Sequence, residues 1–173
     1  KMTMHFKEAV DVIVLIGNQQ NDIASSEYLH KLKGVSHSPA PYFNLDEEYT
    51  MQQFLANCIK TKMVKSAHDI SEGGLMIALL ESGFAGNKGF DVNPVVSIRK
   101  DAYWFGEAQG RVVVSLTAEN AAAFIALANE HNIPVTTLGS VTDNVVNVNG
   151  TNWGSIDNWK EKYDTAIEKT IQG

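Results

Sequence analysis

Residues suited to chemistry are concentrated in the stretch 66–75, which leads directly into the apolar run 75–80. The ligand-binding candidates in it are one imidazole, two carboxylates, one hydroxyl and a glycine pair, namely His68, Asp69, Ser71, Glu72, Gly73 and Gly74. Consecutive glycines let the backbone come close to a ligand or to another segment, and a helix start offers unpaired N–H groups and the positive end of the helix dipole. An anion such as a phosphate group would fit there.

Each of these residues also has a purely structural interpretation. Asp69 and Glu72 have the spacing of an N-cap and N3 pair, and Ser71 could cap the helix instead. His68 could be a buried residue that is bonded to a backbone carbonyl. Because capping pairs are much commoner than anion sites, the residue types alone favour the structural interpretation.

A metal site is the third hypothesis for this stretch. His68, Asp69 and Glu72 offer the nitrogen and oxygen ligands that zinc or manganese can accept. Adjacent His and Asp side chains rarely converge on one ion unless the backbone turns sharply, and no second His motif supplies further ligands. We therefore rank a transition-metal site below the other two hypotheses.

Hydrophobic periodicity and turn residues predict the elements that position this stretch. Strands are expected at Val12–Ile16, Phe90–Ile98, Arg111–Leu116, Val135–Val141 and Val145–Val148. Helices are expected at Glu27–Leu32, Asp46–Lys62, Leu75–Ser82, Ala118–His131 and Asp157–Ile171, the last with Trp159, Tyr163, Ala166 and Ile167 facing inward. The elements alternate irregularly and tight turns join several strands, so we expect an α+β fold with a mixed or antiparallel sheet covered by helices.

Composition excludes several classes of protein. The net charge is −6 and the 14 Lys and Arg residues are scattered, so nucleic-acid binding is not expected. No apolar run approaches the roughly 20 residues of a membrane span, and no secretion signal opens the chain. The single cysteine, Cys58, is expected to be a core residue in a reducing, cytoplasmic compartment. The length predicts one domain, and the first residue, Lys1, suggests a fragment.

Three segments, taken in order, resemble phosphoribosylformylglycinamidine synthase. They are Asp11–Gly17 with Ser26–Leu29, then Ser66–Leu75, then Phe105–Ser115. The resemblance extends from about Phe6 to Val148 and is to the last domain of the synthetase subunit, of the aminoimidazole ribonucleotide synthetase superfamily type. It implies a three-layer α/β/α sandwich with a mixed, partly ferredoxin-like sheet. Residues 1–173 would form that one C-terminal domain, with residues 1–10 as the junction with the preceding domain.

The resemblance also implies an activity. The whole enzyme would be an ATP-dependent carbon–nitrogen ligase of purine biosynthesis that converts formylglycinamide ribonucleotide and glutamine-derived ammonia to formylglycinamidine ribonucleotide. ATP/ADP and magnesium would serve the full-length enzyme, whose partners are a glutaminase and a small accessory subunit. The family's catalytic His lies in an earlier domain, so this chain alone is expected to be inactive. The alternative is a non-catalytic scaffold, or a nucleotide-binding domain of another superfamily member.

Residue roles carry over only at matching positions. In the family's first copy of this domain, the aspartate equivalent to Asp69 helps to hold magnesium and the segment equivalent to 107–109 contacts substrate. The resemblance is to the second copy, so it makes Asp69, Glu107 and Gln109 candidates, with a wholly architectural role as the alternative. Arg111 could act as a fork for phosphate or carboxylate, and its structural alternative is a partner for Glu107 or Asp101. The family's glycine-rich stretch before Glu27 is replaced here by Ile23–Ser26, so no phosphate site is expected in that loop.

Overall fold

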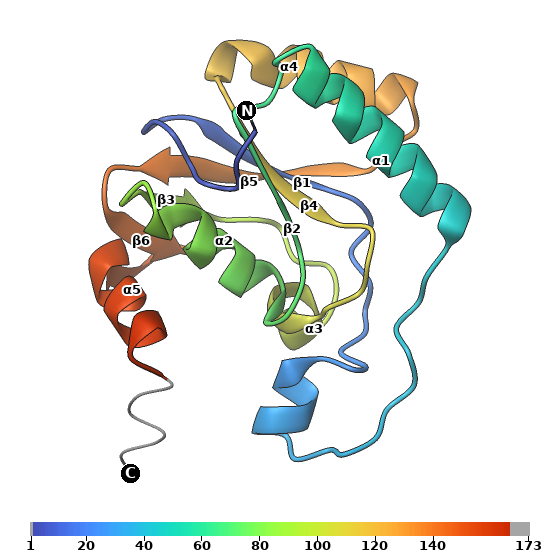
Figure 1. The fold of residues 1–173 in the computed structure, drawn as a ribbon, viewed down its shortest axis with the longest axis vertical. Helices are drawn as coiled ribbons and strands as arrows, with labels where there is room; N and C mark the ends of the chain where they lie inside the picture. The colour runs from blue at the N-terminus through green and yellow to red at the C-terminus, as the bar shows by residue number, and fades with distance from the viewer. Residues whose placement is uncertain (1, 167–173) are drawn as a thin grey trace.

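Residues 2–166 are described by a computed structural model, which contains a seven-stranded mixed sheet and six helices in this part of the chain. The strands are β1 Val12–Ile16, β2 Ser66–Asp69, β3 Gly89–Val92, β4 Val112–Leu116, β5 Val135–Thr142, β6 Val145–Val148 and β7 Thr151–Ser155. The helices are the π-helix η1 Tyr28–Leu32, then α1 Leu45–Lys60, α2 Gly74–Phe84, α3 Lys100–Phe105, α4 Ala118–Glu130 and α5 Ile156–Asp164. The expected mixed sheet with helical cover is confirmed (Figure 1).

The strand order is β2-β4-β1-β5-β3-β6-β7, and every pair is antiparallel except β3 with β6. β5 and β6 follow each other in the chain across the expected turn 142–144, but they do not pair. β3 lies between them and bonds to both. β6 and β7 form a hairpin whose turn residues, Asn149 and Gly150, both have positive φ, as a tight two-residue turn requires.

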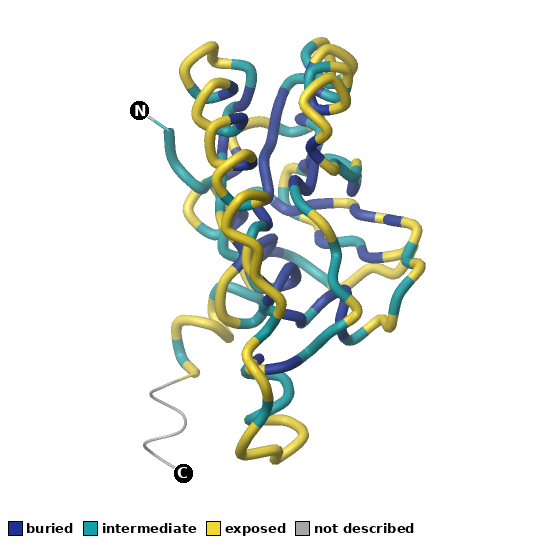
Figure 2. The backbone as a smooth tube through the Cα atoms, turned by 90° about the vertical axis from the view of Figure 1, so that its right-hand side faces the viewer, coloured by how far each residue is buried: buried dark blue, intermediate teal, exposed yellow. Residues whose placement is uncertain are grey.

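Helices cover both faces of the sheet, and side chains of β1 alternate between them. Ile13 and Leu15 belong to a core cluster with apolar residues of α2, α3 and α5, whereas Val14 and Ile16 belong to a second cluster with residues of α1 and α4. This alternation is the period-two pattern of a strand that is buried on both sides. Figure 2 shows the buried stretches along the strands, with exposed stretches on the outer helices.

The spacing of apolar residues predicted α1 correctly. Met51, Phe54 and Cys58 are buried on one side of it, and Asn44 caps its start by accepting hydrogen bonds from the N–H groups of Asp46 and Glu47. Before α1, an extended connector runs from η1 over residues 34–44 along the outside of the molecule (Figure 1).

Three of the expected elements need correction, and three further elements were not expected. The strand expected to reach Ile98 ends at Val92, because Pro94 has no N–H group with which to continue the ladder. The helix α2 continues past Gly83 to Phe84. The elements β2, α3 and β7 were not predicted. In the closing helix, Trp159 packs against the core as expected, but Tyr163 and Ala166 are exposed and Ile167 lies outside the described residues.

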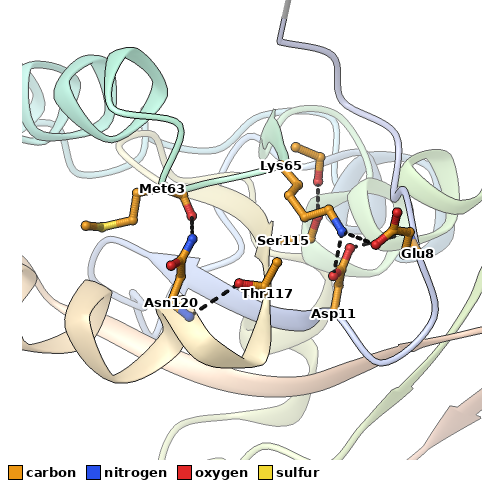
Figure 3. A network of polar contacts seen from close by, with 8 residues as sticks. Glu8, Asp11, Met63, Lys65, Ser115, Thr117 and Asn120 are labelled. Atoms are coloured by element: carbon orange, nitrogen blue, oxygen red, sulfur yellow. Dashed lines mark hydrogen bonds and ion pairs between the residues drawn. The ribbon is translucent and has the colours of Figure 1, made fainter.

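The N-terminal segment 2–11 packs on the domain, and the expectation that residues 1–10 join it to a preceding domain stays a prediction. Phe6 is buried and its N–H group donates to the carbonyl of Ser82. Lys65 binds the carboxylates of Glu8, at 2.6 Å, and Asp11, at 2.9 Å (Figure 3). Since Lys65 directly precedes β2, this ion-pair network anchors the segment beside the edge of the sheet.

Candidate functional site

The predicted cap of α2 is absent. Asp69 is the last residue of β2, where it is paired with Val112 of β4, so it cannot also lie at the helix start. Ser71 donates a hydrogen bond to Asp69 Oδ2 at 2.9 Å, and the N-cap residue of α2 is Gly73, which has no side chain to cap with. The capping interpretation of Asp69, Ser71 and Glu72 is therefore wrong.

The glycine pair brings two backbones together. Gly73 and Gly74 have φ values of 81° and 70°, in the left-handed region that favours glycine. A Cβ atom on Gly74 would lie 2.7 Å from the Cα of Phe105 and 2.8 Å from the carbonyl oxygen of Trp104. The close approach that Gly74 allows is therefore to the end of α3, another segment of the same chain, whereas a Cβ on Gly73 would meet the side chain of Ile77.

The carboxylate of Glu107 lies at the start of α2. Its Oε1 atom accepts a hydrogen bond from the N–H group of Gly73 at 2.8 Å, and a second from the N–H group of Glu27 at 2.8 Å. Glu27 is the residue before η1, so one oxygen atom joins the starts of two helices. A negative charge at a helix start is favourable because it faces unpaired N–H groups.

Arg111 is buried and is hydrogen-bonded to the turn 106–108, which carries Glu107. Its Nε atom donates to the carbonyl of Ala108 at 3.0 Å, Nη2 donates to the carbonyl of Gly106 at 2.6 Å, and Nη1 donates to Oε1 of Gln19 at 2.9 Å. Burial lowers the pKa of Arg111 to about 10, while nearby Tyr103 and Glu107 partly oppose this shift. The expected ion pair with Glu107 or Asp101 is wrong, because Arg111 bonds backbone carbonyls and Asp101 pairs with Arg99.

Six of the nine predicted ligand-binding residues line one pocket of about 420 Å³, where β2 ends and β4 begins. We call it the β2–β4 pocket. The six residues are Asp69, Ser71, Glu72, Glu107, Gln109 and Arg111. Glu48 and Met51 of α1 also line it, so four carboxylates face a single cation, the Arg111 guanidinium, among the described lining residues. This charge balance disfavours a bare phosphate group and favours a ligand that carries a cation.

His68, Gly73 and Gly74 do not line this pocket. His68 Nδ1 lies 3.1 Å from the carbonyl oxygen of Ala78 and 3.2 Å from Ser82 Oγ, and Nε2 lies 3.4 Å from Glu81 Oε2. The interpretation of His68 as a residue bonded to a backbone carbonyl fits this geometry. Within residues 2–166, no three His, Cys, Asp or Glu side chains are grouped so that they could hold a metal ion, so the proposed triad with Asp69 and Glu72 is wrong.

Glu48 was not among the predicted site residues, yet its Oε2 atom is buried and has no hydrogen-bond partner among the described residues. Glu48 lies between the β2–β4 pocket and a second hollow of about 410 Å³ that is lined in part by Tyr42, Phe43 and His131. Its position three residues before the buried Met51 was a usable signal, because residues three apart share one face of a helix.

The family model described as AIR synthase related protein, C-terminal domain, matches residues 9–149. The chain belongs to this family. This AIR synthase related domain is 36% identical over 150 residues to phosphoribosylformylglycinamidine synthase subunit PurL of Caldanaerobacter subterraneus subsp. tengcongensis. The matched part is 86% of this chain but 20% of that protein, so the chain spans about a fifth of the length of the curated relatives it matches.

Solved PurL structures have the fold of this AIR synthase related domain. Thermotoga maritima PurL complexed with FGAR matches with a TM-score of 0.76 at 17% identity, covering 92% of this chain and 29% of that chain. The same protein complexed with ATP gives 0.70 at 15% identity, covering 92% and 27%. The PurLQS structure from T. maritima gives 0.66 at 21% identity, covering 85% and 24%. These likenesses establish the fold alone. None of the helices in residues 2–166 is long and apolar enough to cross a membrane.

Proposed function

We propose that the chain is the C-terminal synthetase-type domain of a phosphoribosylformylglycinamidine synthase subunit. The whole enzyme would be the ATP-dependent ligase that converts formylglycinamide ribonucleotide and glutamine-derived ammonia to formylglycinamidine ribonucleotide in purine biosynthesis. The observation that carries the proposal is the convergence of Asp69, Glu107 and Gln109, taken from two separate motifs of the resemblance, on the β2–β4 pocket. The PurL relative of 36% identity supports it.

The finer description of the fold belongs to this proposal. The helices divide between the two core clusters, which supports a three-layer α/β/α sandwich. Part of the chain has the βαββαβ order of a ferredoxin-like unit, in the sequence β1, α1, β2, β4, α4, β5 when α2, β3 and α3 are left out. Its four strands lie in the sheet in the order β2-β4-β1-β5, which supports a partly ferredoxin-like sheet. The domain would span residues 1–173, with residues 1–10 leading in from the preceding domain.

The ligands and partners of the whole enzyme follow by analogy. T. maritima PurL was solved complexed with ATP, with ADP and with FGAR, and also within PurLQS. We propose that the parent of this chain uses ATP and magnesium, with Asp69 as the magnesium candidate in this domain. Its partners would be the preceding domains, a glutaminase and a small accessory subunit, in the cytoplasm. The domain supplies a wall of the enzyme and needs the rest of the chain for activity.

A chimera tests the proposed function. The part of the Caldanaerobacter subunit that matches this chain would be replaced by residues 1–173, and formylglycinamidine ribonucleotide would be measured with substrate, ATP, magnesium and ammonia. We expect the chimera to turn over, while this chain alone and the relative without its matching part do not. A folded chimera that binds substrate and ATP like the relative but forms no product would contradict the proposal.

A further inference from the structure

The start of α2 has the geometry of an anion site, and a carboxylate of the chain already fills it. Gly73 and Glu27 direct their N–H groups at the same oxygen atom, Glu107 Oε1, each at 2.8 Å. Oxyanions of ligands use this arrangement at helix starts. Here the oxyanion is covalently part of the domain, so it competes with any external anion at a high effective concentration.

Hydrogen bonds from Arg111 hold the turn that carries Glu107. Arg111 donates to the carbonyls of Gly106 and Ala108, the residues on either side of Glu107. Because Arg111 is buried and a third hydrogen bond ties it to Gln19, the turn has little freedom to move Glu107 away from the two N–H groups. Arg111 therefore acts on the pocket through the position of Glu107.

The surrounding charges work against replacement of this carboxylate. Asp69, Glu72 and Glu48 line the same pocket, and an entering phosphate or carboxylate would meet their negative potential. No lysine lines the pocket in the described chain to compensate for that potential.

We infer that Glu107 is an internal anion that closes the helix start of α2 to anionic ligand groups, and that Arg111 is the positioning residue that keeps it there. The inference concerns this domain alone and does not depend on the proposed function. The N–H groups of Gly73 and Glu27 would then remain occupied whatever the pocket binds.

Chemical rescue tests this inference. Glu107→Gly removes the carboxylate and leaves room for a small external one, so its unfolding midpoint should fall by about 5 °C or more and recover with sodium formate in a saturable way. Sodium chloride at equal ionic strength is the salt control. Glu72→Ala is the control, because Glu72 lines the same pocket but its carboxylate makes no hydrogen bond within residues 2–166. This variant should gain no more from formate than from chloride.

Several outcomes would overturn the inference. They are an unchanged midpoint in Glu107→Gly, a lowered midpoint that formate does not raise, and equal stabilisation of the unsubstituted chain by formate. If Glu107→Gly does not fold in chloride, refolding by dialysis into formate decides the question, since the inference requires folding there. Glu107→Gln fills the space without the charge, so it should be less stable than the unsubstituted chain and insensitive to formate; equal stability would contradict the need for an anion.

Discussion

His68 and Asp69 are neighbours in β2, yet their side chains lie on opposite faces of the sheet. His68 faces α2, where Nδ1 lies 3.1 Å from the carbonyl oxygen of Ala78, and Asp69 lines the β2–β4 pocket. The alternation of side chains along a strand produces this separation. His68 therefore stabilises the packing of α2 on the sheet, whereas Asp69 is accessible to a ligand in the pocket.

The first prediction follows from this separation. His68→Ala removes a half-buried ring together with its contacts to Ala78 and Glu81, so the free energy of unfolding should fall by about 1–3 kcal/mol. Asp69→Ala is the matched control on the exposed side, and it should change the free energy by no more than about 0.5 kcal/mol. Urea unfolding followed by circular dichroism measures both. A larger loss for Asp69 than for His68 would contradict the assignment.

The second prediction concerns close approach at the glycine pair. Gly74 and Gly34 have nearly equal φ values, 70° and 68°, but a Cβ on Gly34 would meet no atom within 4 Å. Gly34→Ala should therefore cost only the backbone strain, about 1–2 kcal/mol. Gly74→Ala adds a clash with the backbone of Phe105 and should cost about 3 kcal/mol or more. Denaturant midpoints of the two variants compare them directly; equal losses would show that α2 and α3 are further apart than described.

The third prediction is the pH dependence of the Lys65 network. The hydrogen bond and charge of Lys65 lower the pKa of Glu8, so this stabilisation is lost as the pH falls below the ordinary value of 4.5. Burial of Lys65 opposes its charge, but its bonds to Glu8 and Asp11 raise its pKa, so stability is also lost as the pH rises above 10.5. Lys65→Met should flatten the stability profile at both ends, whereas Lys60→Met, at an exposed position, should not. Thermal midpoints from pH 3 to 11.5 test this.

The fourth prediction concerns Cys58, which is fully buried in the core cluster of α1 and α4. Burial raises the pKa of its thiol to about 11, from 9.0, so the folded chain loses stability as the pH rises between these values. At pH 8 the thiol should react with a disulfide reagent only after unfolding. If the Cys58 thiol of the folded chain reacted as fast as that of the unfolded chain, the core beside α1 would be accessible to solvent, which would contradict this prediction.

Local patterns predicted the elements whose causes are local. Helix α1 was found because the spacing of Met51, Phe54 and Cys58 is itself the signal of a buried helix face. Strand β1 was found because its five apolar residues end at Gly17. By contrast, β2, α3 and β7 have weak patterns of their own and were not predicted. β2 is held by pairing with β4 and α3 by packing against the start of α2, both distant in the chain, whereas β7 is held by its hairpin with β6.

The site residues could be named from the sequence, but their contacts could not. Glu107 bonds N–H groups that lie 34 and 80 residues away in the chain, and no local spacing encodes such partners. The same holds for Gly74, whose neighbour is the end of α3. The motif residues were therefore predicted as one group, and only the fold divides them into pocket residues and packing residues.

Amide hydrogen exchange tests the central claim, which is that the Glu107 carboxylate holds the starts of η1 and α2. In the unsubstituted chain the N–H groups of Gly73 and Glu27 should be protected, and in Glu107→Gly both should exchange faster together. The N–H group of Gly74, which donates to the carbonyl of Ser71, should change less and serves as the internal reference. Unprotected Gly73 and Glu27 in the unsubstituted chain, or protection that survives removal of Glu107, would contradict the claim.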